Sequence, residues 1–228
     1  MPEPSFVDLT QPVRPGMPVF PEDPEVSFGA AAAMPPWRVT RLSLGTHSGT
    51  HIDAAAHYVP GGATIDSYPL ARFVLPAHVV PVEAGAGEAV AWSALAGHLP
   101  DELDSCAVLL RTGWDRHWGE DLALEHPYLA KDAAHGLVER GATLVGTDAL
   151  NVDGTAAGTT HAHEVLLGAD VLIVENLTRL EELQPGRACI CAFVPLRLEG
   201  ADGSPIRAYA LPGDGRITQR LPQGAPLS

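Results

Sequence analysis

Short stretches in which apolar and polar residues alternate recur along the chain, and they predict a protein built largely from short strands. Side chains on a strand point to alternate faces, so alternation is typical of a half-buried strand, and a short apolar run is typical of a strand buried on both faces. On this basis we expect strands at residues 6–10, 37–46, 77–83, 107–112, 143–148 and 171–177.

Few segments have the pattern of a helix. We expect a short helix or turn at residues 69–74 and helices at 92–97, 131–140 and 162–167, the last two ended by glycine. Strands that alternate with helices along the chain indicate an α/β protein with a mixed sheet.

A proline-rich segment at residues 11–36 interrupts this order and cannot be helical. An irregular connection of about 26 residues is unusual inside a compact domain, so we interpret it as an arm. Elsewhere the chain has no repeat, low-complexity linker or shift in charge that would separate two halves. We therefore expect one domain over residues 1–228 with an N-terminal arm.

Composition narrows the class of protein. Of the 228 residues, 46% are hydrophobic and 18% are charged, which is typical of a compact globular chain. The formal net charge of −14 argues against nucleic acid as a partner, because a nucleic-acid binder needs Lys and Arg to displace counterions from phosphates. The same acidic field disfavours anionic membranes.

The N-terminus lacks the basic and apolar segments of a secretory signal, and no apolar run is long enough to span a bilayer. The chain has three cysteines, Cys106, Cys189 and Cys191, and their odd number favours core thiols over disulfides or a zinc site. We therefore expect a cytoplasmic protein in a reduced compartment.

Candidate chemistry is concentrated at residues 47–57, which read His-Ser-Gly-Thr-His-Ile-Asp-Ala-Ala-Ala-His. His47, His51, Asp53 and His57 all stand at odd positions, so an extended segment would project them to the same side. Imidazole and carboxylate are ligands that zinc, manganese and iron accept. Burying four such groups without a cation would be costly, and this pattern therefore predicts a metal site.

A carboxylate also closes the apolar strand predicted at 171–177. Val171, Ile173 and Glu175 share one side of that strand, so Glu175 is expected where the end of the sheet faces a pocket. His161 and His163 begin the preceding helix and are further candidates.

The run from His47 to His57 resembles the signature of the cyclase-like metal-dependent hydrolases, the superfamily of bacterial kynurenine formamidase and isatin hydrolase. The family pattern H-x-G-[TA]-H-x-D-[AS]-x-x-H is matched at each defined position, with Ala55 where a proline is common. The resemblance extends from Phe6 to about Tyr209. It implies a mixed sheet or barrel core with peripheral helices, in the swivelling β/β/α arrangement of the cyclase fold.

The resemblance also implies a set of roles. His47, His51 and Asp53 would bind metal, and His57 would donate and accept protons. A histidine twelve residues before a glutamate completes a second metal site in kynurenine formamidases, and His163 and Glu175 have this separation, which leaves His161 as a surface or supporting residue. Asp53 and Glu175 would then bridge two ions.

The number and identity of the ions stay open, because isatin hydrolase uses one manganese. The nitrogen and oxygen ligands permit zinc or manganese, as one or two divalent ions.

The stretch Pro18-Val-Phe-Pro-Glu-Asp-Pro24 resembles a family segment that lines the substrate pocket. Phe20 stands where kynurenine formamidases usually have tryptophan, which weakens the case for a kynurenine substrate. Trp114 and Trp118 either wall the same pocket or fasten a loop.

The implied reaction is hydrolysis of an amide, either an aryl formamide or a cyclic amide. Hydroxide on the metal would attack the carbonyl, and His57 would protonate the leaving nitrogen. An alternative enzyme is a metal-dependent cyclase or lyase that enolises a polyketide-like carbonyl. A different class is a non-catalytic binding protein in which the metal only stabilises the fold. Such a protein would not need His57, a histidine beside the metal that is not itself a ligand. The family also implies a homodimer or a multiple of it, with the arm reaching a neighbouring subunit.

Overall fold

The computed structural model of the protein describes residues 6–31, 35–186 and 189–211. Within these residues the main element is a nine-stranded mixed sheet. Its strands, from one edge to the other, are β1 (Val7–Asp8), β13 (Tyr209–Leu211), β11 (Cys189–Ala192), β5 (Val74–Pro81), β7 (Ala107–Arg111), β9 (Leu144–Thr147), β10 (Leu172–Glu175), β4 (His51–Asp53) and β12 (Gly203–Pro205).

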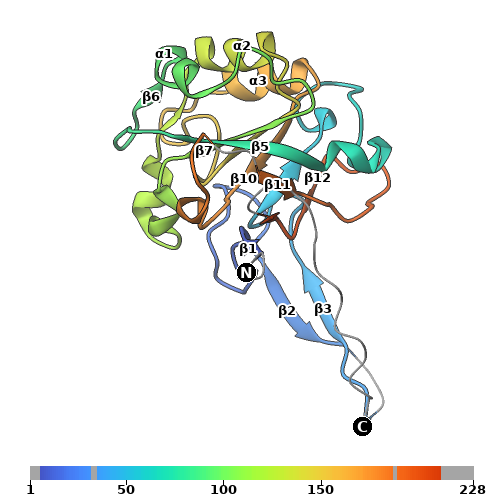
Figure 1. Ribbon diagram of the computed structural model, residues 1–228. Helices are drawn as coiled ribbons and strands as arrows, with labels where there is room; N and C mark the ends of the chain where they lie inside the picture. The colour runs from blue at the N-terminus through green and yellow to red at the C-terminus, as the bar shows by residue number, and fades with distance from the viewer. Residues whose placement is uncertain (1–5, 32–34, 187–188, 212–228) are drawn as a thin grey trace, which may run out of the picture.

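The four central strands β5, β7, β9 and β10 run parallel, and the strands on either side of them pair antiparallel. The helices α1 (Trp92–Leu95), α2 (Lys131–Glu139) and α3 (His161–Gly168) cover one face of the sheet, at the top of Figure 1. Two small sheets pair β2 (Ser27–Ala30) with β3 (Thr40–Ser43) and β6 (Ala89–Val90) with β8 (Tyr128–Leu129).

Seven 3-10 turns complete the elements assigned in the described residues. They are η1 (Ala55–His57), η2 (Ile65–Ser67), η3 (Leu70–Arg72), η4 (Ala96–His98), η5 (Trp114–His117), η6 (Asp121–Glu125) and η7 (Leu180–Glu182).

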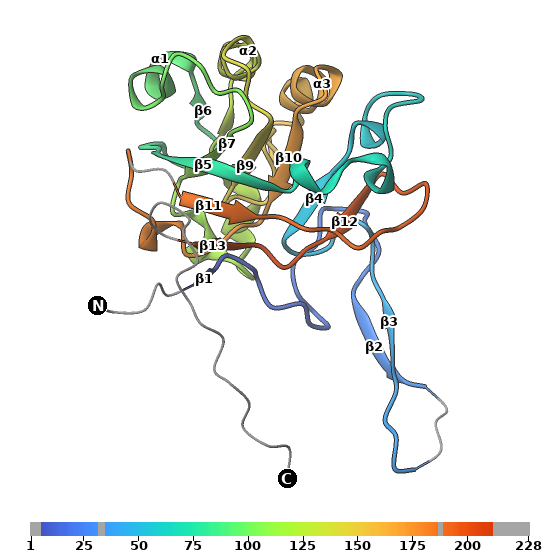
Figure 2. The ribbon, with the colours of Figure 1, turned by 45° about the vertical axis from the view of Figure 1, so that its right-hand side comes forward.

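Strand alternation divides the apolar core between the two faces of the sheet. On β10, Leu172 and Val174 join the core enclosed by the curled sheet, and Ile173 joins the core beneath the helices. Figure 2 shows β11, β13 and β1 folding below the central strands, away from the helices. The structure confirms the expected mixed sheet with peripheral helices.

Most strands and helices fall at their predicted places. The exception is the strand expected at 37–46, which is shorter and lies outside the main sheet: β3 pairs with β2 in a hairpin that projects from the body in Figure 2. The described part of the proline-rich arm contains no helix, but it does contain β2, a strand that the sequence pattern did not indicate.

α3 also differs slightly from expectation at its end. Gly168 is still helical, and the left-handed turn falls on Asp170, with φ of 60°. None of the helices in the described residues has the length and apolar character that a bilayer crossing requires.

Candidate metal centre

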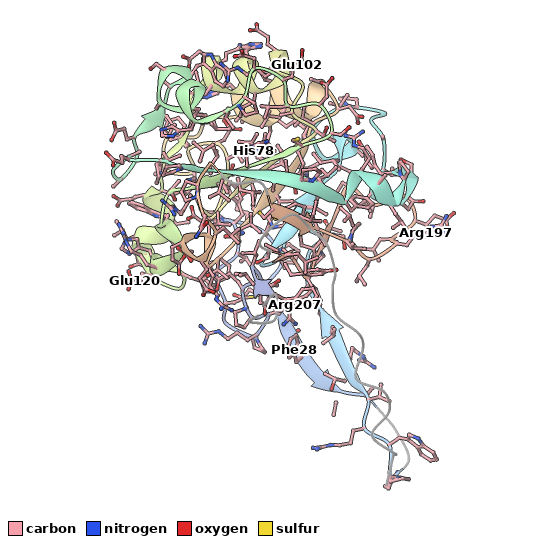
Figure 3. The ribbon with its side chains drawn as sticks, viewed as in Figure 1. Phe28, His78, Glu102, Glu120, Arg197 and Arg207 are labelled. Atoms are coloured by element: carbon pink, nitrogen blue, oxygen red, sulfur yellow. The ribbon has the colours of Figure 1, made fainter. Side chains whose placement is uncertain are left out.

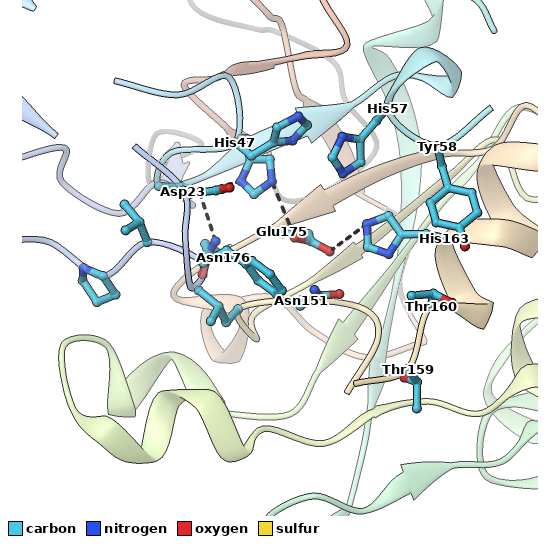
Figure 4. A pocket seen from close by; sticks show the side chains of 16 residues that line it. Asp23, His47, His57, Tyr58, Asn151, Thr159, Thr160, His163, Glu175 and Asn176 are labelled. Carbon is cyan, nitrogen blue, oxygen red and sulfur yellow. Dashed lines mark hydrogen bonds and ion pairs between the residues drawn. The ribbon is translucent and has the colours of Figure 1, made fainter. Parts of the chain in front are cut away.

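A pocket of about 280 Å³ opens beside the carboxyl end of β10. One side of it is polar and contains every predicted ligand except Asp53, which lies beneath it at full burial. The other side is formed mainly by the proline-rich arm and by loops, and includes Val19, Phe20, Tyr58, Leu150, Asn151 and Thr160. Figure 4 shows Glu175 and His163 pointing toward one another as close neighbours, with His47 and His57 beside them.

Antiparallel pairing of β4 with β10 brings the first candidate ligands together. His51 lies opposite Glu175, and Asp53 lies opposite Ile173. Because side chains alternate, Ile52 enters the core on one face while His51 and Asp53 both point to the other. His51 Nε2 is 3.3 Å from Asp53 Oδ1 and 3.5 Å from Glu175 Oε2.

The helix α3 supplies the next candidate ligand, His163. Asp153 accepts hydrogen bonds from the backbone N–H of Ala162 and His163 and from Nδ1 of His163 at 2.9 Å. This fixes the ring, and His163 Nε2 lies 3.6 Å from Asp53 Oδ2 and 3.7 Å from Glu175 Oε1.

His51 is oriented in the same way as His163, because its Nδ1 donates to the carbonyl of Gly49 at 2.8 Å. Because a carbonyl only accepts, Nδ1 carries the proton and Nε2 keeps its lone pair. Histidines that bind metal are commonly held in this way by a carbonyl or carboxylate on the other nitrogen.

The residues of the 47–57 motif converge, but not as one extended segment. Only His51 and Asp53 lie on a strand; His47 lies in a turn that includes Gly49, with φ of +68°, and His57 ends the 3-10 turn η1. The expected alternation therefore applies to two of the four side chains. A tight turn before β4 and a tight turn after it bring in the other two.

These groups fit a divalent cation. Two ligand atoms at about 2.1 Å from one tetrahedral ion lie roughly 3.4 Å apart, and the contacts among His51, His163, Asp53 and Glu175 span 3.3 to 3.7 Å. Asp53 Oδ2 is buried with no hydrogen-bond partner among the described residues, which is costly unless a cation satisfies it.

Each of three groups has its ligand atoms within 4.8 Å of one another: His47, His51 and Asp53; Asp53, His163 and Glu175; and His47, His57 and Asp202. Asp53 belongs to the first two groups, so one carboxylate is shared between two possible ion positions. The donors are nitrogen and oxygen without sulfur, as expected.

Burial and charge act against each other in this cluster. Burial raises the pKa of Glu175, and together with the nearby Asp53 it brings that pKa to about 7. Burial also acts to raise the pKa of Asp53, but the charge of His51 and the neighbouring His163 and His47 outweigh it and hold that pKa well below its usual range. Asp53 therefore carries the negative charge of the centre.

His47, a proposed metal ligand, and His57, the proposed proton carrier, differ in their protonation at neutral pH. His47 has both ring nitrogens on carboxylates, with Nδ1 2.7 Å from Asp53 and Nε2 3.0 Å from Asp202. These contacts outweigh burial and raise the pKa of His47 to about 9. Burial and the charges of His47 and His163 lower the pKa of His57, which is therefore neutral near pH 7.

The other candidates fall outside the cluster. His161 donates from Nε2 to the carbonyl of Leu129 at 2.8 Å. Trp114 is buried with its indole N–H on the carbonyl of Leu122, and neither Trp114 nor Trp118 is among the residues that line the pocket. Trp114 therefore fastens a loop.

Sequence reasoning missed two carboxylates. Asp153, which orients His163, was not among the candidate residues; the spacing Asn151-Val-Asp153-Gly before α3 was the available sign. Sequence reasoning also did not consider Asp202, which contacts His47 and His57 from a distant segment that carries no recognisable motif.

Comparisons with known proteins agree with this geometry. The family model described as Cyclase matches residues 7–154. The chain is 35% identical over 210 residues to a kynurenine formamidase of Paracidovorax citrulli (strain AAC00-1), covering 88% of this chain and 94% of the relative.

Two solved structures have the same fold. An isatin hydrolase bound to the product analogue thioisatinate has a TM-score of 0.81 and 25% identity, covering 90% of this chain and 91% of that one. A structure described as a potential metal-dependent hydrolase with cyclase activity has a TM-score of 0.76 and 29% identity, covering 90% and 96%.

Proposed function

The chain belongs to the Cyclase family, and from this premise we propose that it hydrolyses the amide bond of a small aryl formamide or cyclic amide. The observation that carries the proposal is the shared Asp53 beneath two groups of histidine and carboxylate ligands, at the bottom of a pocket with an apolar wall. Relatives named kynurenine formamidase and isatin hydrolase support a hydrolase of carbon–nitrogen bonds other than peptide bonds.

We assign the ligands as the sequence predicts: His47, His51 and Asp53 for one ion, and His163 with Asp53 and Glu175 for a second. Zinc and manganese both suit these donors. When bound, a divalent metal supplies polarisation of a carbonyl oxygen and lowers the pKa of water to about 7.

The protein side chains supply orientation and proton transfer. Asp153 and the Gly49 carbonyl keep Nδ1 of His163 and His51 protonated, so that each presents Nε2 to the centre. His57 lines the pocket, is neutral near pH 7, and can take a proton at a ring nitrogen and return it to the leaving nitrogen of the amide.

The pocket wall supports a flat, uncharged substrate. Phe20 is exposed to the pocket from the arm, and Tyr58 and Leu150 add apolar surface. Among the described residues that line the pocket there is no Lys or Arg, and Asp23 adds a negative charge. A substrate carboxylate therefore has no cationic side chain to pair with in this wall, which favours a neutral aryl or cyclic amide over N-formylkynurenine.

The deciding experiment compares kcat/KM for N-formylkynurenine, isatin and a simple aryl formamide on metal-replete enzyme. We expect a neutral amide to be the better substrate, and Phe20→Trp to improve N-formylkynurenine relative to the other two. A kcat/KM for N-formylkynurenine above about 10⁴ M⁻¹s⁻¹, the low end of ordinary enzyme efficiency, would contradict this preference. If no amide reacts, enolisation of a ketone substrate replaces hydrolysis as the assignment.

We also propose that the chain is one domain and forms a homodimer through the β2–β3 hairpin. Phe28, Trp37, Val39 and Leu42 are exposed on or beside the hairpin, with Trp37 at 72%. A two-stranded hairpin is marginally stable alone in water, and a contiguous exposed apolar patch is typical of an interaction site. A second copy would cover this patch, and light scattering at micromolar concentration tests it.

The cellular location is a proposal as well. All three cysteines, Cys106, Cys189 and Cys191, are free thiols. Free thiols are typical of proteins in the reducing cytoplasm, which supports this location.

A further inference from the structure

Asp202 is a carboxylate beside His47 and His57 that lies outside the 47–57 motif. Its Oδ2 lies 3.0 Å from Nε2 of His47 and 3.4 Å from Nδ1 of His57, and its Oδ1 accepts a hydrogen bond from Thr46 Oγ1 at 3.0 Å. Its side chain is 42% exposed, so it lies at the rim of the centre rather than beneath it.

The backbone fixes this carboxylate in place. The edge strand β12 pairs with β4, with Gly203 opposite Asp53, and the Ala54 N–H donates to the carbonyl of Asp202 at 2.9 Å. A Cβ at Gly203 would lie 2.7 Å from His47 Cε1, so only glycine lets the strand approach this closely. The approach sets Asp202 beside both histidines.

The contact with His57 decides which of its nitrogens carries the proton. A carboxylate only accepts, so Nδ1 of His57 donates to Asp202 and Nε2 keeps its lone pair. The ring of His57 otherwise rests on His47, with centroids 3.9 Å apart and planes at 36°, a contact that does not distinguish the two nitrogens. Carboxylates that orient a catalytic histidine by this bond are worth large factors in rate.

We propose that Asp202 is a positioning residue that holds His57 with Nδ1 protonated and Nε2 free for the substrate. This rests on the proposed function to the extent that His57 handles the proton of an amide hydrolysis. The group of His47, His57 and Asp202 could also hold a cation of its own, and that alternative is an outcome of the test.

The test is Asp202→Asn, which keeps the size of the side chain and removes its charge. We expect metal content by elemental analysis to be unchanged, kcat to fall about 10- to 100-fold, and KM to stay within about threefold. Nitrogen-15 NMR of the zinc-loaded protein, with His57→Gln to assign the ring signals, should show His57 moving from the Nδ1–H tautomer toward a mixture.

Asp66→Asn is the matched control. Asp66 accepts hydrogen bonds from Thr64 and from the N–H of Gly200, which is in the same loop as Asp202, and neither of these partners is a histidine. It should leave kcat and the His57 tautomer unchanged, which separates loss of the Asp202 carboxylate from a general loosening of the loop.

Three results would overturn the proposal. Loss of metal in Asp202→Asn makes Asp202 a ligand, a rise in KM at constant kcat makes it a substrate contact, and an unchanged His57 tautomer removes the positioning role. If the wild-type enzyme cleaves no amide, the proposed function fails by itself, and the tautomer measurement still decides the role of Asp202.

Discussion

The metal centre and the β2–β3 hairpin each reverse the usual distribution of polar and apolar groups. In the centre, Asp53, His51 and Glu175 are charged or polar and nearly fully buried. In the hairpin, every residue of both strands is exposed, including Phe28 and Leu42. Figure 3 shows Phe28 on the hairpin that projects from the body of the molecule.

Both reversals cost free energy in an isolated chain, and each is relieved by a different kind of partner. Buried carboxylates and imidazoles are stabilised by a cation, and exposed apolar side chains are stabilised by another protein surface. The comparison teaches that buried charged residues and exposed apolar residues mark the places where a ligand or partner is needed. The chemistry of those residues indicates whether it is a cation or another protein surface.

The largest effect is expected from the buried side of the comparison. Asp53→Asn removes the carboxylate shared by both ligand groups, so metal content should fall and activity should drop by about 10⁴-fold or more. The reason is that several kcal/mol of transition-state stabilisation leave with the metal, at 1.36 kcal/mol per factor of ten. Elemental analysis and kinetics check this, with Asp170→Asn, an exposed carboxylate paired with Arg72, as the control. Full metal content in Asp53→Asn would contradict the shared-ligand assignment.

The next effect separates proton transfer from metal binding. His57→Ala should keep its metal and lose about 10²- to 10⁴-fold in kcat, the usual range for a positioned acid or base. The same elemental analysis decides the outcome, since a metal-free His57→Ala protein would make His57 a ligand.

On the exposed side, the expected effect is on assembly. Phe28 and Leu42 lie opposite each other in the hairpin register. The double substitution Phe28→Ser and Leu42→Ser should raise the Kd of the dimer by at least about 100-fold, because each buried apolar side chain contributes about 1.5–3 kcal/mol. Light scattering over a concentration series measures this. Leu70→Ser, at a leucine outside the hairpin that is more exposed than either Phe28 or Leu42, should leave the dimer intact; dissociation by both variants would remove the hairpin as the interface.

The smallest effect is a pH dependence. Contacts with Asp153 and Asp53 outweigh burial and raise the pKa of His163 to about 10. Since the unfolded value is near 6.5, the protonated ring stabilises the metal-free fold fully below that pH, and the stabilisation is lost as pH rises toward 10. A metal needs the neutral ring and so competes with protons.

The Tm of the metal-free protein should therefore fall between pH 7 and 10, by at least about 3 °C if 1 kcal/mol is lost. The gain in Tm on adding buffered zinc should grow over the same interval. Scanning fluorimetry with and without zinc checks both trends, and Asp153→Asn should weaken them. A metal-free Tm that rises with pH would mean that the histidines are already neutral at pH 7.

The sequence was sufficient for features that depend on residues close together in the chain. His47, His51, Asp53 and His57 could be singled out because all four lie within eleven residues and match one short motif. The central strands and α2 could also be predicted from the sequence, because apolar periodicity reflects which face each element buries.

Some local geometry was nevertheless misjudged. The 47–57 motif has the same parity as an extended strand, but Gly49 adopts positive φ and Ala55–His57 form a 3-10 turn. Alternation describes direction only where the backbone stays extended, and nothing in the pattern of polar residues showed where it turns.

What the sequence determined by itself is the family and the type of fold, and it singled out the side chains that we propose as metal ligands, because these follow from short motifs and from periodicity. Only the tertiary structure decided that Asp202 stands beside His57 and that Asp153 orients His163. Asp202 reaches His47 and His57 because β12 pairs with β4, two strands about 150 residues apart in the chain. Such a contact is set by the order of strands in the sheet, and that order depends on packing across the whole core rather than on any local spacing.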